Sequence, residues 1–350
     1  ISMKLHNRVN GRELKAILQQ SDEKRTTLSF YKYFHFANPE LVRNHLFLTW
    51  DKIGVMGRIY IAHEGINGQI SIPDARMEDF NASCSELEFM NGTRHNIAID
   101  DDGKSFFKLK ITVRKKIVAD GLDDSTFDVM DSGKHLSAKE MNAMLAAKDT
   151  VVVDMRNHYE SEVGHFEGAI RPDVETFRES LPIISDMLAE NKDKNIVMYC
   201  TGGIRCEKAS AYMKHKGYQN VFQLDGGIIE YARQVKEQEL VNKFLGTNFV
   251  FDERLGERIS EDIVSKCHQC GDACDKHTNC ANDYCHLLFI QCDNCKSEYE
   301  NTCSSLCKEY LHMPIEKQIE AGKNKIFNGS KFGKGRYNPK VVGENNLLKA

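Results

Sequence analysis

Cys200 is the residue of this sequence whose surroundings have the clearest chemistry. It follows the strand-like run 197–199 and precedes the segment Thr201-Gly202-Gly203-Ile204-Arg205, beyond which a helix-forming stretch begins. A cysteine between a strand and a helix N-terminus faces loop N–H groups and the positive end of the helix dipole, and both favour the nucleophilic thiolate. We therefore predict an active-site loop at 201–204, with Cys200 and Arg205 as its catalytic residues. The alternative is a buried structural cysteine.

The length and charge of the chain narrow its class. Its 350 residues are enough for two or three domains with ordinary cores. A formal net charge of −4 gives no overall attraction to nucleic acid, so any such binding requires local basic patches. The sequence has no apolar run of about 18 residues and no signal-peptide pattern. We expect a soluble, cytoplasmic protein without a membrane partner, with Met3 as its native start.

Residues 1–120 have the order of elements of a ferredoxin-like domain. The pattern predicts strands at 26–34, 57–62, 69–72 and 108–118, with helices at 39–50 and 73–88. Strand, helix, two strands, helix, strand is the order of that fold. The connection His63-Glu64-Gly65-Ile66-Asn67-Gly68 is predicted as a hairpin-like turn.

The predicted strand 108–118 carries five basic residues and no acidic residue. Alternating basic side chains on one strand face can line a phosphate backbone, and the neighbouring Phe106 and Phe107 can stack on bases. The other interpretation is a solvated strand face, which spacing alone favours. The candidate phosphate-binding residues are Lys108, Lys110, Arg114, Lys115 and Lys116.

Residues 121–238 have the pattern of an α/β domain. Short buried strands are predicted at 150–155, 195–199 and 221–224, with helices between them, and Ser137 to Glu140 matches a capping box. This alternation indicates a parallel sheet covered on both faces, which places its sites beyond the carboxyl ends of the strands. Cys200 lies at such an end.

Four motifs in this segment resemble those of rhodanese-like domains. They are Asp154-x-Arg156, Gly164-His165-x-x-Gly168-Ala169, the loop from Cys200 to Arg205, and Gly226-Gly227-Ile228. Four residues separate Cys200 from Arg205, whereas the related cysteine-based phosphatases have one more. The smaller loop suits a terminal sulfur better than a phosphoryl group, so phosphatase activity is disfavoured.

Residues 239–350 form a cysteine-rich module with a basic tail. Nine of the twelve cysteines lie between Cys267 and Cys307, and clustered cysteines in a reducing compartment indicate metal before disulfides. Two Cys-x-x-Cys pairs have the spacing of a closed, structural Zn²⁺ site, and free thiols, disulfides or an iron–sulfur cluster are the alternatives. The predicted zinc ligands are Cys267, Cys270, Cys292 and Cys295, and a second set could be Cys280, Cys285, Cys303 and Cys307. The tail's basic residues are Lys323, Lys325, Lys331, Lys334, Arg336 and Lys340, with a solvated tail as the default interpretation.

Nearly the whole chain is similar to the bacterial rhodanese-like tRNA uridine hydroxylases. The similarity is carried by 65–68, Lys108-Leu109-Lys110, the motif from Cys200 to Ser210, 248–254 and Cys267-His268-Gln269-Cys270. It implies an acylphosphatase-like (ferredoxin-like) N-terminal domain, a central rhodanese-like domain and a cysteine-rich C-terminal module, which is a multidomain chain of α/β and α+β class. It also implies the oxygen-dependent conversion of the wobble uridine of tRNA to 5-hydroxyuridine.

The resemblance shifts the interpretation of the basic residues towards tRNA, whose anticodon loop presents an unpaired base. Phe106, Phe107 or Tyr199 are then the candidates to stack on that base. Dioxygen is the implied co-substrate, and the absence of a dinucleotide-binding fingerprint predicts no flavin or nicotinamide.

Three functions remain open from the sequence. In the first, Cys200 adds to C6 of uracil and activates C5 for hydroxylation, or carries a persulfide that takes part in oxygen activation. In the second, the protein is a rhodanese-type sulfurtransferase that moves sulfur from thiosulfate or a persulfide to an acceptor. In the third, it only binds tRNA, which the intact Cys200 and Arg205 disfavour.

Overall fold

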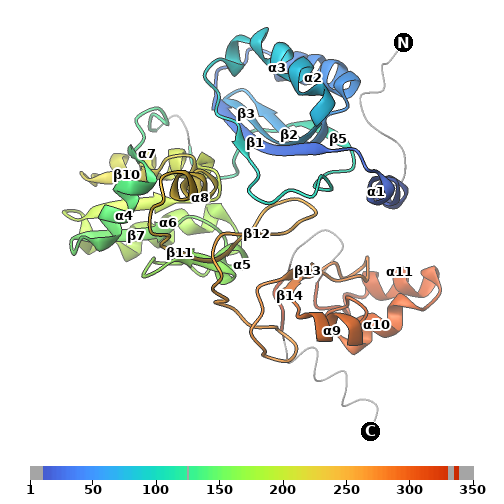
Figure 1. Cartoon of the computed structure of the whole chain (residues 1–350). Helices are drawn as coiled ribbons and strands as arrows, with labels where there is room; N and C mark the ends of the chain where they lie inside the picture. The colour runs from blue at the N-terminus through green and yellow to red at the C-terminus, as the bar shows by residue number, and fades with distance from the viewer. Residues whose placement is uncertain (1–10, 124–125, 330–334, 339–350) are drawn as a thin grey trace. The chain divides into compact units, whose positions relative to one another are not determined.

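The computed structural model, shown in Figure 1, describes residues 11–123, 126–329 and 335–338. The chain divides into two compact units. The first unit consists of the described residues up to His158, together with Gly168–Lys243 and Val250–Glu257. The second consists of Tyr159–Glu167, Phe244–Phe249 and the described residues from Arg258 onward. Within the described residues, no helix is both long and apolar enough to cross a membrane.

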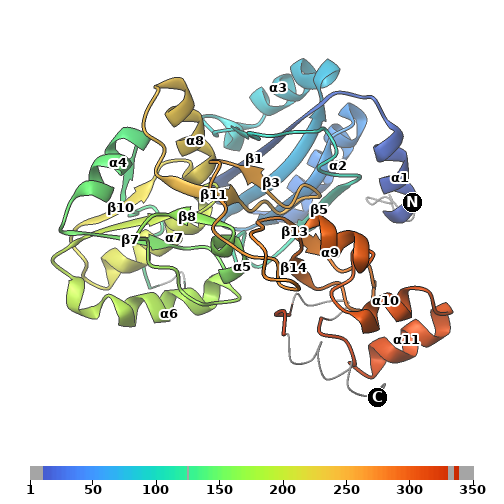
Figure 2. The same cartoon turned by 60° about the horizontal axis from the view of Figure 1, so that its bottom comes forward.

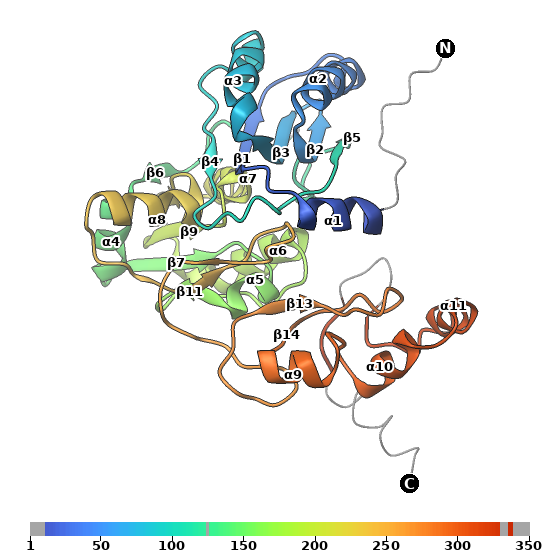
Figure 3. The same ribbon diagram turned by 45° about the vertical axis from the view of Figure 1, so that its right-hand side comes forward.

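The first unit begins with helix α1 (Gly11–Gln20) and a five-stranded sheet in the order β4-β1-β3-β2-β5. Its strands are β1 (Arg25–Tyr33), β2 (Met56–Ala62), β3 (Gly65–Pro73), β4 (Asn96–Ile97) and β5 (Leu109–Val113). Helices α2 (Pro39–Ile53) and α3 (Met77–Ser85) cover one face of this sheet (Figure 3). Short 3₁₀ turns flank α3 at Asp74–Arg76 and Glu88–Met90.

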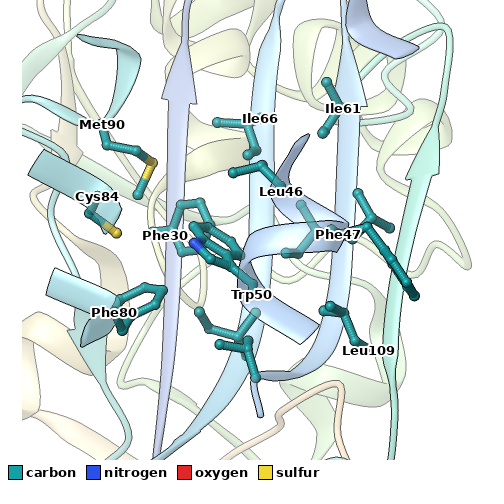
Figure 4. Close-up of a cluster of buried hydrophobic side chains, with 14 of the residues drawn as sticks. Phe30, Leu46, Phe47, Trp50, Ile61, Ile66, Phe80, Cys84, Met90 and Leu109 are labelled. Carbon is teal, nitrogen blue, oxygen red and sulfur yellow. The ribbon is translucent and has the colours of Figure 1, made fainter. Parts of the chain in front are cut away.

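The core of this domain lies between the two helices and the sheet. Trp50 of α2 packs edge-on against Phe30 of β1, with ring centroids 6.1 Å apart, and its ring is tilted against that of Phe80 of α3 at 5.2 Å (Figure 4). Asn38 caps α2 by accepting a hydrogen bond from the Leu41 N–H, as Asn before Pro predicts. Burying these aromatic rings fixes α2 and α3 on the sheet.

The ferredoxin-like layout is confirmed, but the predicted identity of its last strand is wrong. The short strand β4 pairs antiparallel with β1 and takes that place, whereas β5 adds parallel to β2 at the opposite edge. Residues 114–118 lie outside any strand. A strand of two residues has no period-two pattern to read, while the apolar alternation of 109–113 is clear.

The predicted turn at 63–68 is also shorter than expected. Only His63 and Glu64 form the turn, and 65–68 belong to β3. Gly65 has φ 151°, and a Cβ there would lie 2.1 Å from the Lys32 carbonyl oxygen. A Cβ at Gly68 would lie 2.5 Å from the Phe30 ring. These glycines therefore permit close approach inside the sheet rather than chain reversal.

The first unit continues with a parallel sheet in the order β6-β10-β9-β7. The strands are β6 (Lys134–Leu136), β7 (Thr150–Asp154), β9 (Asn195–Tyr199) and β10 (Val221–Leu224). The helices are α4 (Ala138–Ala146), α6 (Phe177–Met187), α7 (Ile204–His215) and α8 (Gly227–Glu237), with a 3₁₀ turn at Ala189–Asn191. The capping box at the start of α4 is confirmed, because Ser137 and Glu140 exchange both hydrogen bonds. Parallel strands and α/β order are those predicted.

The second unit contains short strands and the cysteine-rich segment. Strand β8 (Gly164–Phe166) pairs antiparallel with β11 (Phe244–Asn248), and β13 (His277–Asn279) pairs antiparallel with β14 (Leu288–Ile290). Helix α5 (His158–Glu162) and strand β12 (Glu257–Arg258) begin at the boundaries between the units. Helices α9 (Asp293–Glu298), α10 (Ser305–Leu311) and α11 (Ile315–Lys323) follow one another in the last part (Figure 2).

Candidate active site

Cys200 lies directly beyond the end of β9, and its loop leads into α7. Its side chain is fully buried. The backbone turns at Gly203, which has φ 101°, and the N–H of Gly203 donates a hydrogen bond of 3.1 Å to the Cys200 sulfur. The loop amide is thus aimed at the sulfur, in the way that a strand–cysteine–glycine–helix sequence predicts.

The surroundings of Cys200 favour its thiolate. Burial opposes ionisation, but the Cys206 thiol, the Arg205 guanidinium and the N–H groups of Gly203 and Arg205 outweigh it and lower the pKa of Cys200 from 9.0 to about 6. The pKa of Cys206 is instead well above its ordinary value, because it is buried beside the Cys200 sulfur. Cys206 therefore stays protonated and donates to the Cys200 thiolate.

Arg205 occupies the first turn of α7 with its guanidinium turned back to the loop. The Nη2 atom lies 3.4 Å from the Thr201 hydroxyl, and the guanidinium carbon lies 6.0 Å from the centroid of the Phe251 ring. Its side chain is buried. A buried cation beside the loop attracts an anion there more strongly than a solvated one would.

The first residues of α8 donate backbone hydrogen bonds to the Cys200 loop. The N–H of Ile228 donates to the Cys200 carbonyl at 3.0 Å, and the N–H of Ile229 donates to the Thr201 carbonyl at 3.3 Å. Gly227 has φ 68°, and a Cβ there would lie 2.5 Å from the Thr201 oxygen and 2.6 Å from the Cys200 oxygen. Glycine at position 227 therefore allows the start of α8 to approach the backbone of the Cys200 loop closely.

The Asp154-x-Arg156 motif links the carboxyl ends of β7 and β9. Both side chains are fully buried, and Arg156 donates to the two carboxylate oxygens of Asp154 at 2.9 and 2.7 Å. The Tyr199 hydroxyl donates to the same carboxylate at 2.7 Å. The Tyr199 ring is fully buried and its hydroxyl is held in this network, so the structure gives no support to the suggestion that Tyr199 stacks on a base. Phe106 is buried as well, whereas Phe107 is half-buried and is the stacking candidate that the structure favours.

Residues of the N-terminal sheet lie against the Cys200 loop and the start of α7. The sequence did not predict these contacts. The Tyr31 hydroxyl donates to Glu207 at 3.0 Å, and a Cβ on Gly203 would lie 2.9 Å from that hydroxyl oxygen. The Asn96 amide donates to the Gly202 carbonyl at 3.5 Å. The alternating Tyr31 and Tyr33 were a visible signal, but nothing in the sequence showed which domain they would face.

A buried group of ion pairs joins α7 to the turn between β2 and β3 of the N-terminal sheet. The Lys208 ammonium lies 2.6 Å from the carboxylates of both Glu64 and Asp120, and its side chain is fully buried. Glu64 also accepts a hydrogen bond of 2.7 Å from the Ile117 N–H. Glu64 thus contributes to the joint between the domains, rather than only to a turn.

The predicted basic residues do not share one strand face, because β5 ends at Val113. Lys110, Arg114 and Lys115 are exposed. The Lys108 ammonium lies 5.6 Å from the Phe107 ring centroid. Lys116 instead binds the Asp120 carboxylate at 2.7 Å and the Leu122 carbonyl at 2.6 Å. Of the tail residues, Lys331, Lys334 and Lys340 lie outside the described residues.

The predicted zinc ligands come together in the second unit. The sulfur atoms of Cys267, Cys270, Cys292 and Cys295 all lie within 4.8 Å of one another. The N–H groups of Cys292 and Cys295 donate to sulfurs of the group at 3.4 and 3.5 Å. Four converging thiols with N–H donors fit a tetrahedral metal ion.

Comparison with known proteins covers the same segments. Residues 25–117 match the family described as a UPF0176 acylphosphatase like domain, 137–234 match the rhodanese-like domain, and 245–308 match the rhodanase C-terminal family. A tRNA uridine(34) hydroxylase of Photorhabdus laumondii is 55% identical over 333 residues, which is 93% of this chain and 95% of the relative. The chain belongs to the tRNA uridine(34) hydroxylase family.

Other tRNA uridine(34) hydroxylases match over a similar length. That of Cronobacter sakazakii is 55% identical over 95% of this chain and 97% of its own. That of an Enterobacter species is 54% identical over 96% of this chain and 97% of its own. These relatives confirm the family resemblance, and the matched segments confirm the order of fold classes along the chain.

Proposed function

We propose that this protein hydroxylates the wobble uridine of tRNA at C5 to give 5-hydroxyuridine, with Cys200 as the catalytic nucleophile. The observation that carries the proposal is the Cys200 sulfur beyond the end of β9, which accepts a hydrogen bond from the Gly203 N–H and whose pKa the loop lowers, found in a chain that matches tRNA uridine(34) hydroxylases over nearly its whole length. The alternative structural role for Cys200 does not account for a loop that lowers the pKa of this thiol.

The first chemical step is addition of the Cys200 thiolate to C6 of the uracil ring. The new S–C6 bond moves the electron pair of the C5–C6 double bond onto C5 and the O4 carbonyl, which makes C5 nucleophilic. Arg205 and the Gly203 N–H hold the thiolate before the attack and when it leaves. Because Cys200 is fully buried, the base must displace side chains that cover the loop.

The oxidation is balanced by dioxygen and a thiol reductant. One oxygen atom becomes bonded to C5, and the other leaves as water with two electrons and two protons from the reductant. Loss of the C5 proton and expulsion of the Cys200 thiolate from C6 then restore the double bond. No flavin or nicotinamide enters this scheme.

Exposed basic residues near β5 are the proposed contacts to the anticodon arm. Lys110, Arg114 and Lys115 are solvent-accessible cations, and Phe107 lies under Lys108 where a base could stack. We do not assign Lys116 to this surface, because its ammonium is held by Asp120. A base in the anticodon loop is unpaired, so presenting it to Cys200 breaks no base pair.

A structural Zn²⁺ is the proposed occupant of the group Cys267, Cys270, Cys292 and Cys295. The Cys270 and Cys292 sulfurs lie 3.6 Å apart, close to the separation of about 3.8 Å that four sulfurs at about 2.3 Å from zinc adopt. Four thiolate ligands leave no position for water or substrate, so this ion stabilises the fold and takes no part in the chemistry.

Mass spectrometry of tRNA nucleosides tests the proposed reaction in cells. Deletion of the gene should remove 5-hydroxyuridine, and the wild-type gene should restore it. Cys200→Ser should not restore it, whereas Cys84→Ala, a change at a buried cysteine of α3, should. Loss of a thiolated uridine instead would support the sulfurtransferase alternative, and an unchanged nucleoside profile would refute both reactions.

A further inference from the structure

The eight cysteines of the two metal-ligand groups alternate in pairs along the chain. The pairs are 267/270, 280/285, 292/295 and 303/307. The first and third pairs form the group described above, and the second and fourth form another group whose sulfurs also lie within 4.8 Å of one another. Each group therefore closes a loop that contains a pair belonging to the other group.

The sulfur separations of the second group fit a metal ion and are not those of disulfides. The Cys285 and Cys303 sulfurs lie 3.6 Å apart, and those of Cys303 and Cys307 lie 3.7 Å apart. These separations match the edge of about 3.8 Å of a zinc–thiolate tetrahedron. They are far longer than the S–S bond of about 2 Å, and all four cysteines are free.

Backbone donors converge on this second group as well. The N–H of Cys303 donates to the Cys280 sulfur at 3.4 Å, and the N–H of Gly329 donates to the Cys285 sulfur at 3.3 Å. A Cβ at Gly329 would lie 2.3 Å from the Cys285 carbonyl oxygen, so the approach requires glycine. N–H groups aimed at sulfur stabilise thiolate ligands more than thiols.

The two groups differ in their exposure. All four cysteines of the second group are buried, in a cluster with Leu287, Phe289, Ala321 and Phe327. In the first group Cys270 is exposed and Cys292 is half-buried. Without a metal these four buried groups would stay neutral thiols, whereas a bound cation would compensate the charge of four thiolates in the apolar core.

We infer that Cys280, Cys285, Cys303 and Cys307 bind a second Zn²⁺, and that the two ions brace the C-terminal module through interlocked loops. The inner ion lies within the module's hydrophobic core, and the outer ion is the one that solvent reaches. Removal of the outer ion opens the loop from Cys270 to Cys292 but leaves the inner tetrahedron and its apolar cover in place. The inference does not depend on the tRNA reaction.

Metal analysis of the full-length protein, purified without chelator, tests the count. Wild-type protein should contain two zinc ions per chain, and Cys84→Ser should contain the same number. Cys270→Ser should contain one, because only the outer tetrahedron loses a ligand. Cys303→Ser should lose the inner ion, and if that variant does not fold, the wild-type and Cys270→Ser values still decide the question.

The rate of zinc release tests which ion is protected. With a chromogenic chelator and a thiol-blocking mercurial, one equivalent of zinc should be released quickly and the second only as slowly as the module unfolds. Cys270→Ser should lack the fast phase and keep the slow one. One zinc per wild-type chain, a single release phase for two ions, or iron in place of zinc would overturn the inference. None of these results would alter the nucleoside profile that tests the proposed reaction.

Discussion

The phenol of Tyr31 donates a hydrogen bond of 3.0 Å to the carboxylate of Glu207. Tyr31 lies on β1 of the N-terminal sheet, and Glu207 lies in the first turn of α7, next to Cys206. The same carboxylate accepts from His135 and Gln223, each at 2.9 Å. Burial opposes the charge of Glu207, but the hydrogen bonds from His135 and Gln223 outweigh burial and lower the pKa of Glu207. The N-terminal domain is thereby tied to the helix that follows the reactive loop.

Replacing Tyr31→Phe should weaken this joint. Losing a hydrogen bond to a charged group costs about 1.5–3 kcal/mol of unfolding free energy. The value of kcat/KM for tRNA should also fall, because Tyr31 would no longer be held in place beside Gly203. Tyr33→Phe is the matched control on the same strand, since its hydroxyl makes only a 3.5 Å contact to the Ile204 carbonyl. Denaturant unfolding compares the two. Equal effects of both variants would contradict the role given to Glu207.

The pH dependence of the reaction should follow the ionisation of Cys200. Its pKa is lowered from 9.0 to about 6, so kcat/KM should rise as the pH increases through about 6 and then level off. Below that pH the sulfur is protonated and cannot attack. A pH–rate profile with a midpoint near 9 would show that the loop does not stabilise the thiolate.

Cys206→Ala should move the same midpoint upward. Cys206 donates to the Cys200 thiolate, and a hydrogen bond to a charged group of about 1.5–3 kcal/mol corresponds to about one to two pH units. Cys84→Ala should leave the profile unchanged. If Cys206 were a resolving thiol instead, the midpoint would stay near 6 and only multiple turnover would be lost.

The support of the loop by α8 can be tested with two glycines of positive φ. Gly227→Ala and Gly217→Ala both place a side chain in the left-handed region, which costs about 1–2 kcal/mol. Only at Gly227 does the new Cβ meet the Cys200 and Thr201 carbonyl oxygens, whereas a Cβ at Gly217 would meet no described atom within 4 Å beyond its own chain neighbours. Thermal unfolding should show losses of stability in both variants, and kinetics a loss of activity in Gly227→Ala alone. A fully active Gly227→Ala enzyme would contradict the account.

Local sequence patterns predicted much of this structure. The Cys200 loop, the capping box at Ser137 and the spacing of Cys267 and Cys270 depend on residues close in the chain, so periodicity and turn chemistry reveal them. The contacts of Tyr31 and the ion pairs of Lys208 were missed, because they join residues far apart in the sequence. The role of β4 was missed because two residues carry no pattern.

Charge reversal at the exposed basic residues tests the tRNA surface. Lys110→Glu combined with Arg114→Glu should weaken tRNA binding and reduce the slope of log affinity against log salt by about 0.7–0.9 for each lost phosphate contact. Lys139→Glu combined with Lys148→Glu changes the net charge equally at other exposed positions and is the control. Binding isotherms at several salt concentrations measure both quantities. Wild-type affinity and slope in the first variant would show that these residues are only a solvated face.

The central claim is that Cys200 in its loop hydroxylates the wobble uridine with oxygen from dioxygen. The most direct measurement uses purified protein, a thiol reductant and tRNA from cells that lack the gene, incubated under isotopically labelled dioxygen. Mass spectrometry of the nucleosides should find 5-hydroxyuridine that carries the heavy isotope, with none formed by Cys200→Ser or without oxygen. Full activity of a folded Cys200→Ser protein, or product whose oxygen comes from water, would contradict the account.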